Sequence, residues 1–293
     1  MTDYALGMVI GSLLCFALFA VRLGFSGQKA ATALPALALS ALLAALLSKA
    51  GYVLLMANRE LANYGWGAFV RFRPELFCFT LGAVGAVLGT VLASRLMRRP
   101  VTPVLDAFAP VLALLVMIFR LGEHHLGMIG AGNYVEAEGW LAGFPFTLQN
   151  AYGEHYWAVY MLEAAVALLI ALFAQSRRGS FSWTVLLLVL TQILLESLRA
   201  KSMKWGFVRV EQVLCALLAV GMLVHACSHG SARCRWLTVP GAVLLIAVVG
   251  FMEFALEKTN LPNLICYGLM LLSLTGVAGL YAYASAKEGH HLQ

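Results

Sequence analysis

Apolar residues run along this chain in long stretches that are separated by short polar segments. Nine stretches are long enough to cross the hydrocarbon core of a bilayer, which takes roughly 17–25 residues in a helix. They lie near residues 4–21, 33–57, 76–94, 104–121, 156–174, 181–198, 207–227, 236–254 and 264–284. A helix satisfies its own backbone hydrogen bonds inside lipid. The pattern therefore predicts an all-α, polytopic bundle of seven to nine transmembrane helices.

Composition supports this class of protein. The chain is 61% hydrophobic and only 12% charged, whereas about a quarter of the residues are charged in a soluble domain. The formal net charge is +6, which we assign to basic loops beside anionic lipid headgroups. No basic run with interleaved aromatic residues occurs, so nucleic acid is not an expected partner. We read residues 5–21 as a retained first span rather than a cleaved signal peptide.

The six cysteines lie mostly inside apolar runs, where cysteine behaves as a small hydrophobic residue. No C-x-x-C pair occurs, so neither a metal site nor a redox pair is expected. We expect no cofactor.

The longest polar insertion covers residues 122–155 and is predicted to form a small extramembrane segment. It is rich in glycine and aromatic residues as well as in acids and histidines. The acids and histidines are Glu123, His124, His125, Glu136, Glu138, Glu154 and His155.

Successive loops of a multi-span protein lie on opposite sides of the membrane, which divides the loops into two sets. Both sets contain lysine and arginine, so these residues alone do not decide the orientation. One set is almost purely basic, with only Asp106 and Glu288 as acids. The other set carries charges of both signs. We expect the first set to be cytoplasmic, which places the N-terminus outside and the C-terminus inside.

The first candidate site is Arg120-Leu-Gly-Glu123-His124-His125, at the end of the fourth span. An arginine fork can bind a phosphate, and Glu123 with the histidines can hold or move protons. The alternative is an ordinary charged helix end with a snorkelling arginine. A metal site from His124, His125 and His155 is a further alternative, but adjacent histidines on a helix diverge by roughly 100°.

The second candidate site lies at the end of the sixth span. Gln192, Glu196 and Arg199 recur at helical spacing and share one face. This face either forms an intrahelical Glu196–Arg199 pair or meets Arg120 across a polar cavity. Glu211 and Gln212 stand at the start of the seventh span. The glutamine can cap the helix or bond a lipid headgroup, and capping is the default expectation.

Two further segments carry weaker signals. His155 enters the fifth span together with Tyr160 and Glu163, and it can act as a general base or be an ordinary interfacial histidine. Small residues follow Phe79 at Gly82, Gly85 and Gly89, and their spacing favours close helix packing.

The order of these motifs resembles that of the bacterial prolipoprotein diacylglyceryl transferases. The similar segments are Gly51-Tyr-Val-Leu54, Asp106-Ala-Phe-Ala-Pro110, Arg120-Leu-Gly122, Glu196-Ser-Leu-Arg199 and Gln212-Val-Leu. The resemblance covers roughly residues 1–225. It implies a transferase-like core at residues 1–228 with seven spans and the small segment 122–155, followed by a two-helix extension at residues 229–293.

The resemblance implies an enzyme of the bacterial inner membrane that functions in lipoprotein biosynthesis. Its phospholipid substrate would be phosphatidylglycerol or a similar lipid, and its acceptor a lipobox peptide or another acceptor. We expect Arg120, Glu123, His124 and His155 to be catalytic. Arg199, Glu196, Gln192, Gln212, Tyr160 and Thr80 are expected to bind substrate.

The chain departs from the family at chemical positions. The family's H-G-G-L histidine would fall at Thr80, and the signature asparagine after R-x-G is Glu123. We therefore expect a divergent transferase with altered chemistry or substrate. The alternatives are a non-catalytic membrane protein that binds lipid or a partner, and a small transporter.

Overall fold

The computed structural model describes residues 2–136, 139–176, 180–228, 236, 238–259 and 261–290, and it omits the side chains of residues 2–5, 74, 257 and 286–290. Glu138, Arg177, Arg178, Arg233, Arg235, Cys234 and the side chains of Lys287 and Glu288 lie outside the described parts. The helices are α1 (Thr2–Phe25), α2 (Ala33–Leu55), α3 (Ala57–Tyr64), α4 (Phe79–Leu96), α5 (Val101–Gly122), α6 (Val159–Ser176), α7 (Phe181–Leu198), α8 (Val210–Ser228), α10 (Thr238–Ile246), α11 (Glu253–Lys258) and α12 (Asn263–His290). The strands are β1 (Ala131–Tyr134), β2 (Thr147–Gln149), β3 (His155–Ala158), β4 (Lys204–Trp205) and β5 (Val208–Arg209).

Within the described residues, nine helices are long and apolar enough to cross a membrane. Each of them overlaps one of the nine apolar stretches, so the predicted spans are confirmed. The eighth span is continuous through α10, the π-helix η6 (Ala247–Met252) and α11. The protein is thus a multi-pass membrane protein built mainly of helices.

The chain forms two compact units, an N-terminal unit of residues 1–184 and a C-terminal unit of residues 185–293. The predicted boundary after residue 228 followed from the family resemblance, and it remains a prediction. Residue 229 lies outside the described residues.

In the N-terminal unit, α2 and α4 pack closely because glycines line α4 at the contact. A Cβ atom added at Gly85 would lie 2.4 Å from the carbonyl oxygen of Leu43, and one at Gly89 would lie 2.4 Å from the nitrogen of Ser40. The hydroxyl of Ser40 also donates to the carbonyl of Ala86 across this contact, at 2.8 Å. The predicted role of these glycines in close packing is confirmed.

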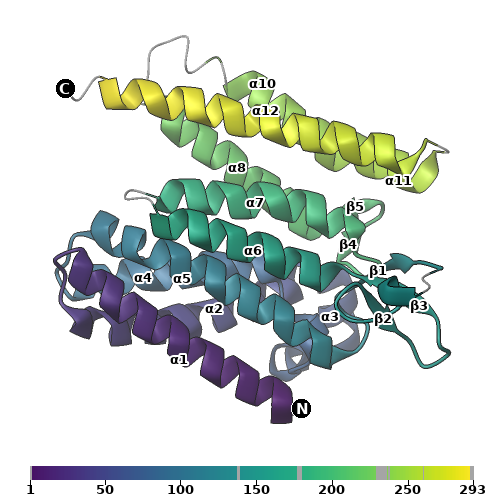
Figure 1. Ribbon diagram of the computed structural model, residues 1–293, viewed down its shortest axis with the longest axis horizontal. Coiled ribbons are helices and arrows are strands. Elements are labelled where there is room, and N and C mark those ends of the chain that lie inside the picture. Colours follow the sequence, from purple (N-terminus) through teal and green to yellow (C-terminus); the bar gives the residue numbers. More distant parts are fainter. Residues whose placement is uncertain are drawn as a thin grey trace. The chain divides into compact units, whose positions relative to one another are not determined.

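Helices α1, α5 and α6 of the same unit run side by side, as Figure 1 shows. At one end, Nη1 of Arg22 donates to Oε1 of Gln175 at 2.5 Å, and the backbone N–H of Phe181 donates to Oδ1 of Asp106 at 3.1 Å. The opposite end of this unit carries residues 122–155, the predicted extramembrane segment. We call that end the cap side.

The cap side differs from the all-α expectation, because the predicted extramembrane segment contains a small antiparallel sheet in the order β1-β3-β2. Gly127, with a φ of +69°, ends the 3-10 turn η4 (Glu123–Leu126) and lets the chain leave α5 toward β1. The hydroxyl of Tyr156 in β3 donates to Glu154 at 3.0 Å, which raises the pKa of Tyr156 above its usual value. Strands of three or four residues with glycines and aromatics give little periodicity, so the sequence pattern did not indicate them.

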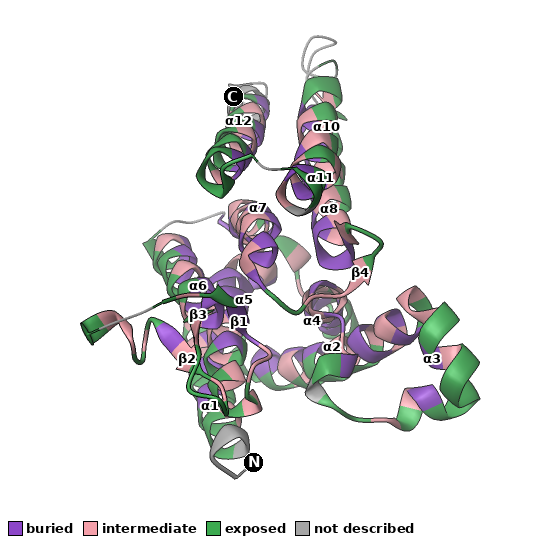
Figure 2. Cartoon of the chain, turned by 90° about the vertical axis from the view of Figure 1, so that its right-hand side faces the viewer, coloured by how far each residue is buried: buried purple, intermediate pink, exposed green. Residues whose placement is uncertain are grey.

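A second irregular segment joins α2 to α4 through α3 and the 3-10 turns η2 (Gly65–Val70) and η3 (Pro74–Leu76). Buried Lys49 on α2 holds it, because its ammonium donates to the carbonyl of Arg71 at 2.6 Å. Figure 2 shows the many exposed residues around α3 and the buried residues gathered on α5.

The C-terminal unit contains α8, α10 and α12, which pack against one another, together with the two-stranded hairpin β4-β5. The hairpin directly precedes α8, so that Arg209 at the end of β5 stands beside Val210 at the start of the helix. This short hairpin is the second departure from the all-α expectation.

Candidate functional site

Two carboxylates flank the guanidinium of Arg120 at the cap-side end of α5. Nη1 of Arg120 donates to Oε1 of Glu123 at 2.6 Å, and Nε lies 3.1 Å from Oε2 of Glu163 on α6. The second contact is an ion pair, since the Nε–H lacks hydrogen-bond alignment. Arg120 and Glu163 are each only 3% exposed. A buried arginine needs such partners, because an unpaired charge in this environment is costly.

Neighbouring elements fix this ion-pair cluster in place. The ring of Phe79, the first residue of α4, lies under the guanidinium with its centroid 3.9 Å from Cζ of Arg120. Gly130 closes the other side, because a Cβ atom there would lie 2.7 Å from both Oε2 of Glu123 and Cβ of Tyr160. Residues from α4, α5, α6 and the loop before β1 thus converge on one point of the N-terminal unit.

His124 and Tyr160 form the second part of the cluster. Nδ1 of His124 lies 2.9 Å from the hydroxyl of the fully buried Tyr160, at hydrogen-bond distance. The ring of His124 also contacts His125 and Phe144 edge-on, with centroids 5.3 Å and 5.5 Å away. The bond to Tyr160 fixes the orientation of the His124 ring, so that its other nitrogen is the one left for chemistry.

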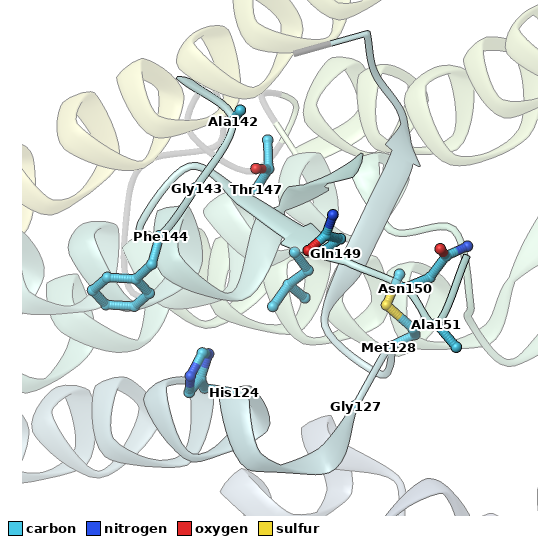
Figure 3. Close-up of a pocket in the computed structure, with 11 residues that line it drawn as sticks. His124, Gly127, Met128, Ala142, Gly143, Phe144, Thr147, Gln149, Asn150 and Ala151 are labelled. Carbon is cyan, nitrogen blue, oxygen red and sulfur yellow. The ribbon is translucent and has the colours of Figure 1, made fainter. Parts of the chain in front are cut away.

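A cavity of about 570 Å³ lies beside His124. Figure 3 shows His124 on one side of it, with Phe144, Thr147 and Gln149 of the extramembrane segment across from the ring. Gly127 and Met128 line it next to His124. Among the predicted catalytic residues, His124 is therefore the one that lines this cavity.

The remaining predicted residues of the N-terminal unit have separate positions. His155 is in β3 and not in a helix, and its Nδ1 lies 3.3 Å from Oγ1 of Thr147, which lines the cavity. Thr80 is buried near the start of α4, next to Phe79. The structure thus brings Arg120, Glu123, His124 and Tyr160 directly together.

The role of Glu163 was not predicted from the sequence, although the residue lies in the fifth span. A carboxylate three residues after Tyr160 within an apolar span is the signal that identifies it, since charge in a span is expensive and needs a partner. Gly130 had no such signal, because its role depends on contacts between segments that are distant in the chain.

The second candidate site lies in the C-terminal unit. Nε2 of Gln192 donates to Oε2 of Glu196 at 3.2 Å, and Nε of Arg199 lies 4.0 Å from the same oxygen. All three side chains are less than a tenth exposed. The shared face and the intrahelical pair are confirmed. Because Arg120 belongs to the other unit, a meeting of this face with Arg120 stays a prediction.

Arg209 organises this part of the C-terminal unit, a role that was not predicted from the sequence. Its Nη1 donates to the carbonyl oxygens of Glu196 and Arg199 at 2.7 Å each, and its Nη2 donates to that of Ser197 at 3.2 Å. These carbonyls lie at the end of α7, where a helix has no further backbone donors of its own. Arg209 therefore caps α7.

Gln212 does not cap its own helix, contrary to expectation. Its Nε2 donates to the carbonyl of Ile193 at 2.9 Å and to Oε1 of Glu253 at 2.7 Å. Oε2 of Glu253 accepts from Nε of Arg209 at 3.0 Å. Both Gln212 and Glu253 are fully buried. A glutamine at a helix start is typical of a cap, but here its Nε2 bonds to distant segments and its Oε1 accepts no hydrogen bond from any described residue.

The described residues hold no group of three or more histidines, cysteines or acids able to bind a metal ion. His124 and His125 are adjacent, while His155 bonds with Thr147. Comparison of the chain with family models, with curated proteins and with solved structures gives no match.

Proposed function

We propose that this protein is a divergent membrane transferase that resembles the phosphatidylglycerol:prolipoprotein diacylglyceryl transferases. The observation that carries this proposal is the joint position of two clusters at the cap side of the N-terminal unit. One is the Arg120–Glu123–Glu163 ion-pair cluster, and the other is His124 with Tyr160 beside the cavity. An anion-binding group and a proton acceptor lie together there.

In this proposal Arg120 stabilises the phosphate of the donor lipid. The contacts with Glu123 and Glu163 run through Nη1 and Nε. A planar guanidinium carries five N–H donors, so it can bind a phosphate oxygen in addition to such partners. Positive charge near the leaving phosphate lowers the barrier to its departure.

His124 is the proposed general base. It takes the proton from the thiol of a cysteine acceptor, and the thiolate sulfur then attacks the glyceryl carbon of the donor. The new S–C bond forms as the C–O bond to phosphate breaks, and the leaving group is glycerol phosphate. Tyr160 holds the imidazole, while His155 is a more distant proton acceptor linked to the cavity through Thr147.

The second polar face completes the proposal. Glu196, Arg199, Gln192 and Gln212 of the C-terminal unit are proposed to bind substrate, and so are Tyr160 and Thr80 of the N-terminal unit. The proposed transferase core has seven spans, and two further spans follow it. The cap side would face the outer leaflet of a bacterial inner membrane, with the N-terminus outside. The donor is a phosphatidylglycerol-like lipid, and the acceptor is a lipobox peptide or another acceptor.

A lipidomic comparison of cells with and without the protein tests the proposal. We expect an acyl-glyceryl product or a changed headgroup in cells with the wild type and with His125→Gln, and none with His124→Gln. His125 is a matched control because it is adjacent and exposed but does not bond with Tyr160. Identical lipid profiles with and without the protein would contradict the proposal.

A non-catalytic protein that binds lipid or a partner is the second candidate. It is favoured by one observation, that Arg120 already has two carboxylate partners and is almost fully buried. In that case Glu123→Ala and His124→Ala would leave lipid binding and cellular function intact, while Gly85→Ala, which separates α2 from α4, would abolish both.

A further inference from the structure

Glu253 is a carboxylate that is 0% exposed inside the eighth membrane span. An acid within a span is expensive, so it marks a functional or organising position and needs a partner. The family resemblance ends before this span and gives Glu253 no role. Its position in the structure calls for a separate explanation.

Both oxygens of Glu253 accept hydrogen bonds, each from a different element. Nε of Arg209 donates to Oε2 at 3.0 Å, and Nε2 of Gln212 donates to Oε1 at 2.7 Å. The carboxylate thereby links the eighth span to the end of β5 and to the first turn of α8. A charged acceptor shared by two buried donors fixes the direction of both side chains.

The two donors then act on α7. Arg209 donates to the carbonyls of Glu196, Ser197 and Arg199, and Gln212 donates to that of Ile193. Three backbone carbonyls in the last part of α7, and that of Arg199 directly after it, thus accept from side chains that Glu253 holds. Glu196 and Arg199 themselves belong to this stretch of residues.

The local backbone before Glu253 supports a special role. The π-helix Ala247–Met252 ends directly at Glu253. A π-helical turn inserts an extra residue, which rotates the following side chains by about 100° around the axis. Such turns are rare and occur frequently at functional sites. Here the turn determines the face on which Glu253 lies.

We propose that Glu253 is a positioning residue, which holds Arg209 and Gln212 against the end of α7 and so fixes the polar face of Glu196 and Arg199. The eighth span then contributes a residue to this polar site. The claim about α7 stands on the contacts alone. The claim that it affects substrate binding rests on the proposed function.

Hydrogen–deuterium exchange of the full-length protein in lipid nanodiscs tests the structural claim. In Glu253→Gln, we expect exchange at the amides of residues 196–209 to rise on the order of a hundredfold, because the cap on α7 loses its charged anchor. Exchange in α12 and in the N-terminal unit should be unchanged. Lys258→Gln is the matched control, since Lys258 is exposed in the same helix, α11.

A double-substitution cycle decides whether Glu253 acts through Arg209. In an Arg209→Met background, the further change Glu253→Gln should raise exchange at residues 196–209 by a much smaller factor than it does in the wild-type background, because only the contact with Gln212 is then lost. If Glu253→Gln does not fold, Glu253→Asp keeps the charge but shortens its reach, and should raise exchange in the same residues by a smaller factor. Unchanged exchange, a uniform rise across the chain, or an undiminished effect without Arg209 would overturn the inference.

Turnover adds a separate readout. In Glu253→Gln we expect the KM for the lipid to rise about tenfold with kcat within about twofold, since Glu196 and Arg199 would bind substrate. A fall in kcat at unchanged KM would contradict a role in positioning that face. If the wild type itself turns over no lipid, the proposed function fails, and the exchange measurements still decide the role of Glu253.

Discussion

Arg120 and Glu163 form an ion pair between two neighbouring membrane spans, with 3.1 Å between Nε and Oε2. Glu123 binds the same guanidinium from the other side, so that one positive charge faces two negative charges. The arrangement persists only if the side chains of Arg120, Glu123 and Glu163 keep their positions relative to one another. This requirement makes Arg120 both the proposed anion-binding group and a structural element of the N-terminal unit.

Arg120→Met should strongly destabilise the protein. The change leaves the carboxylates of Glu123 and Glu163 without their cation, and breaking a buried pair from one side costs about 3–5 kcal/mol. Thermal unfolding in detergent measures the loss. Arg59→Met is the control, because Arg59 is exposed on α3. Equal unfolding temperatures for the two variants would show that the ion pair contributes little.

Tyr160→Phe should reduce turnover without weakening lipid binding. The substitution removes only the hydroxyl that bonds with Nδ1 of His124, so the base loses its fixed orientation. We expect kcat to fall about tenfold or more with KM within about twofold. Tyr152→Phe, at an exposed hydroxyl of the extramembrane segment, should have no effect. An unchanged kcat in Tyr160→Phe would remove His124 from the proposed chemistry.

Gly130→Ala should disturb the whole cluster. The new Cβ would lie 2.7 Å from Cβ of Tyr160, an atom that cannot move without its helix. Overpacking of this kind costs about 1–3 kcal/mol. Gly143→Ala is the matched control in the same unit, because a Cβ there meets nothing within 4 Å. Comparable unfolding temperatures of the two variants would argue against a close fit around Glu123 and Tyr160.

Gly89→Ala should separate α2 from α4. Its Cβ would lie 2.4 Å from the backbone nitrogen of Ser40, and backbone cannot yield as a side-chain tip can. We expect a loss of about 1–3 kcal/mol or more, measured by thermal unfolding. Gly221→Ala, in α8, adds a Cβ with nothing within 4 Å and should be neutral. An unchanged unfolding temperature in Gly89→Ala would show that α2 and α4 can move apart without loss of stability.

The spans and one part of the site were predictable because their signals are local. A long apolar run identifies a span whatever it packs against. Arg120, Glu123 and His124 are neighbours in the chain, so one helix end presents them together. Glu163 and Tyr160 come from the next span, and the sequence does not show which faces of two apolar helices meet.

The parts that were not predicted depend on distant contacts. Arg209 caps α7 because the hairpin β4-β5 brings it back to that helix, and Glu253 reaches Arg209 from another 44 residues along the chain. Arg209, Gln212 and Glu253 lie in separate segments, and none of them forms a recognisable motif with its neighbours in the sequence. The small sheet of the extramembrane segment was not predicted for a related reason. Its short strands are defined by their pairing and not by an alternation of apolar and polar residues.

The most direct measurement of the central claim is release of glycerol phosphate by the purified protein in phosphatidylglycerol vesicles containing a cysteine peptide. With the wild type, we expect glycerol phosphate and a diacylglyceryl thioether to appear in equal amounts. His124→Gln should lower the rate about a hundredfold or more, within the usual contribution of a general base, while His125→Gln keeps it. No turnover by the wild type with any thiol or hydroxyl acceptor would contradict the account.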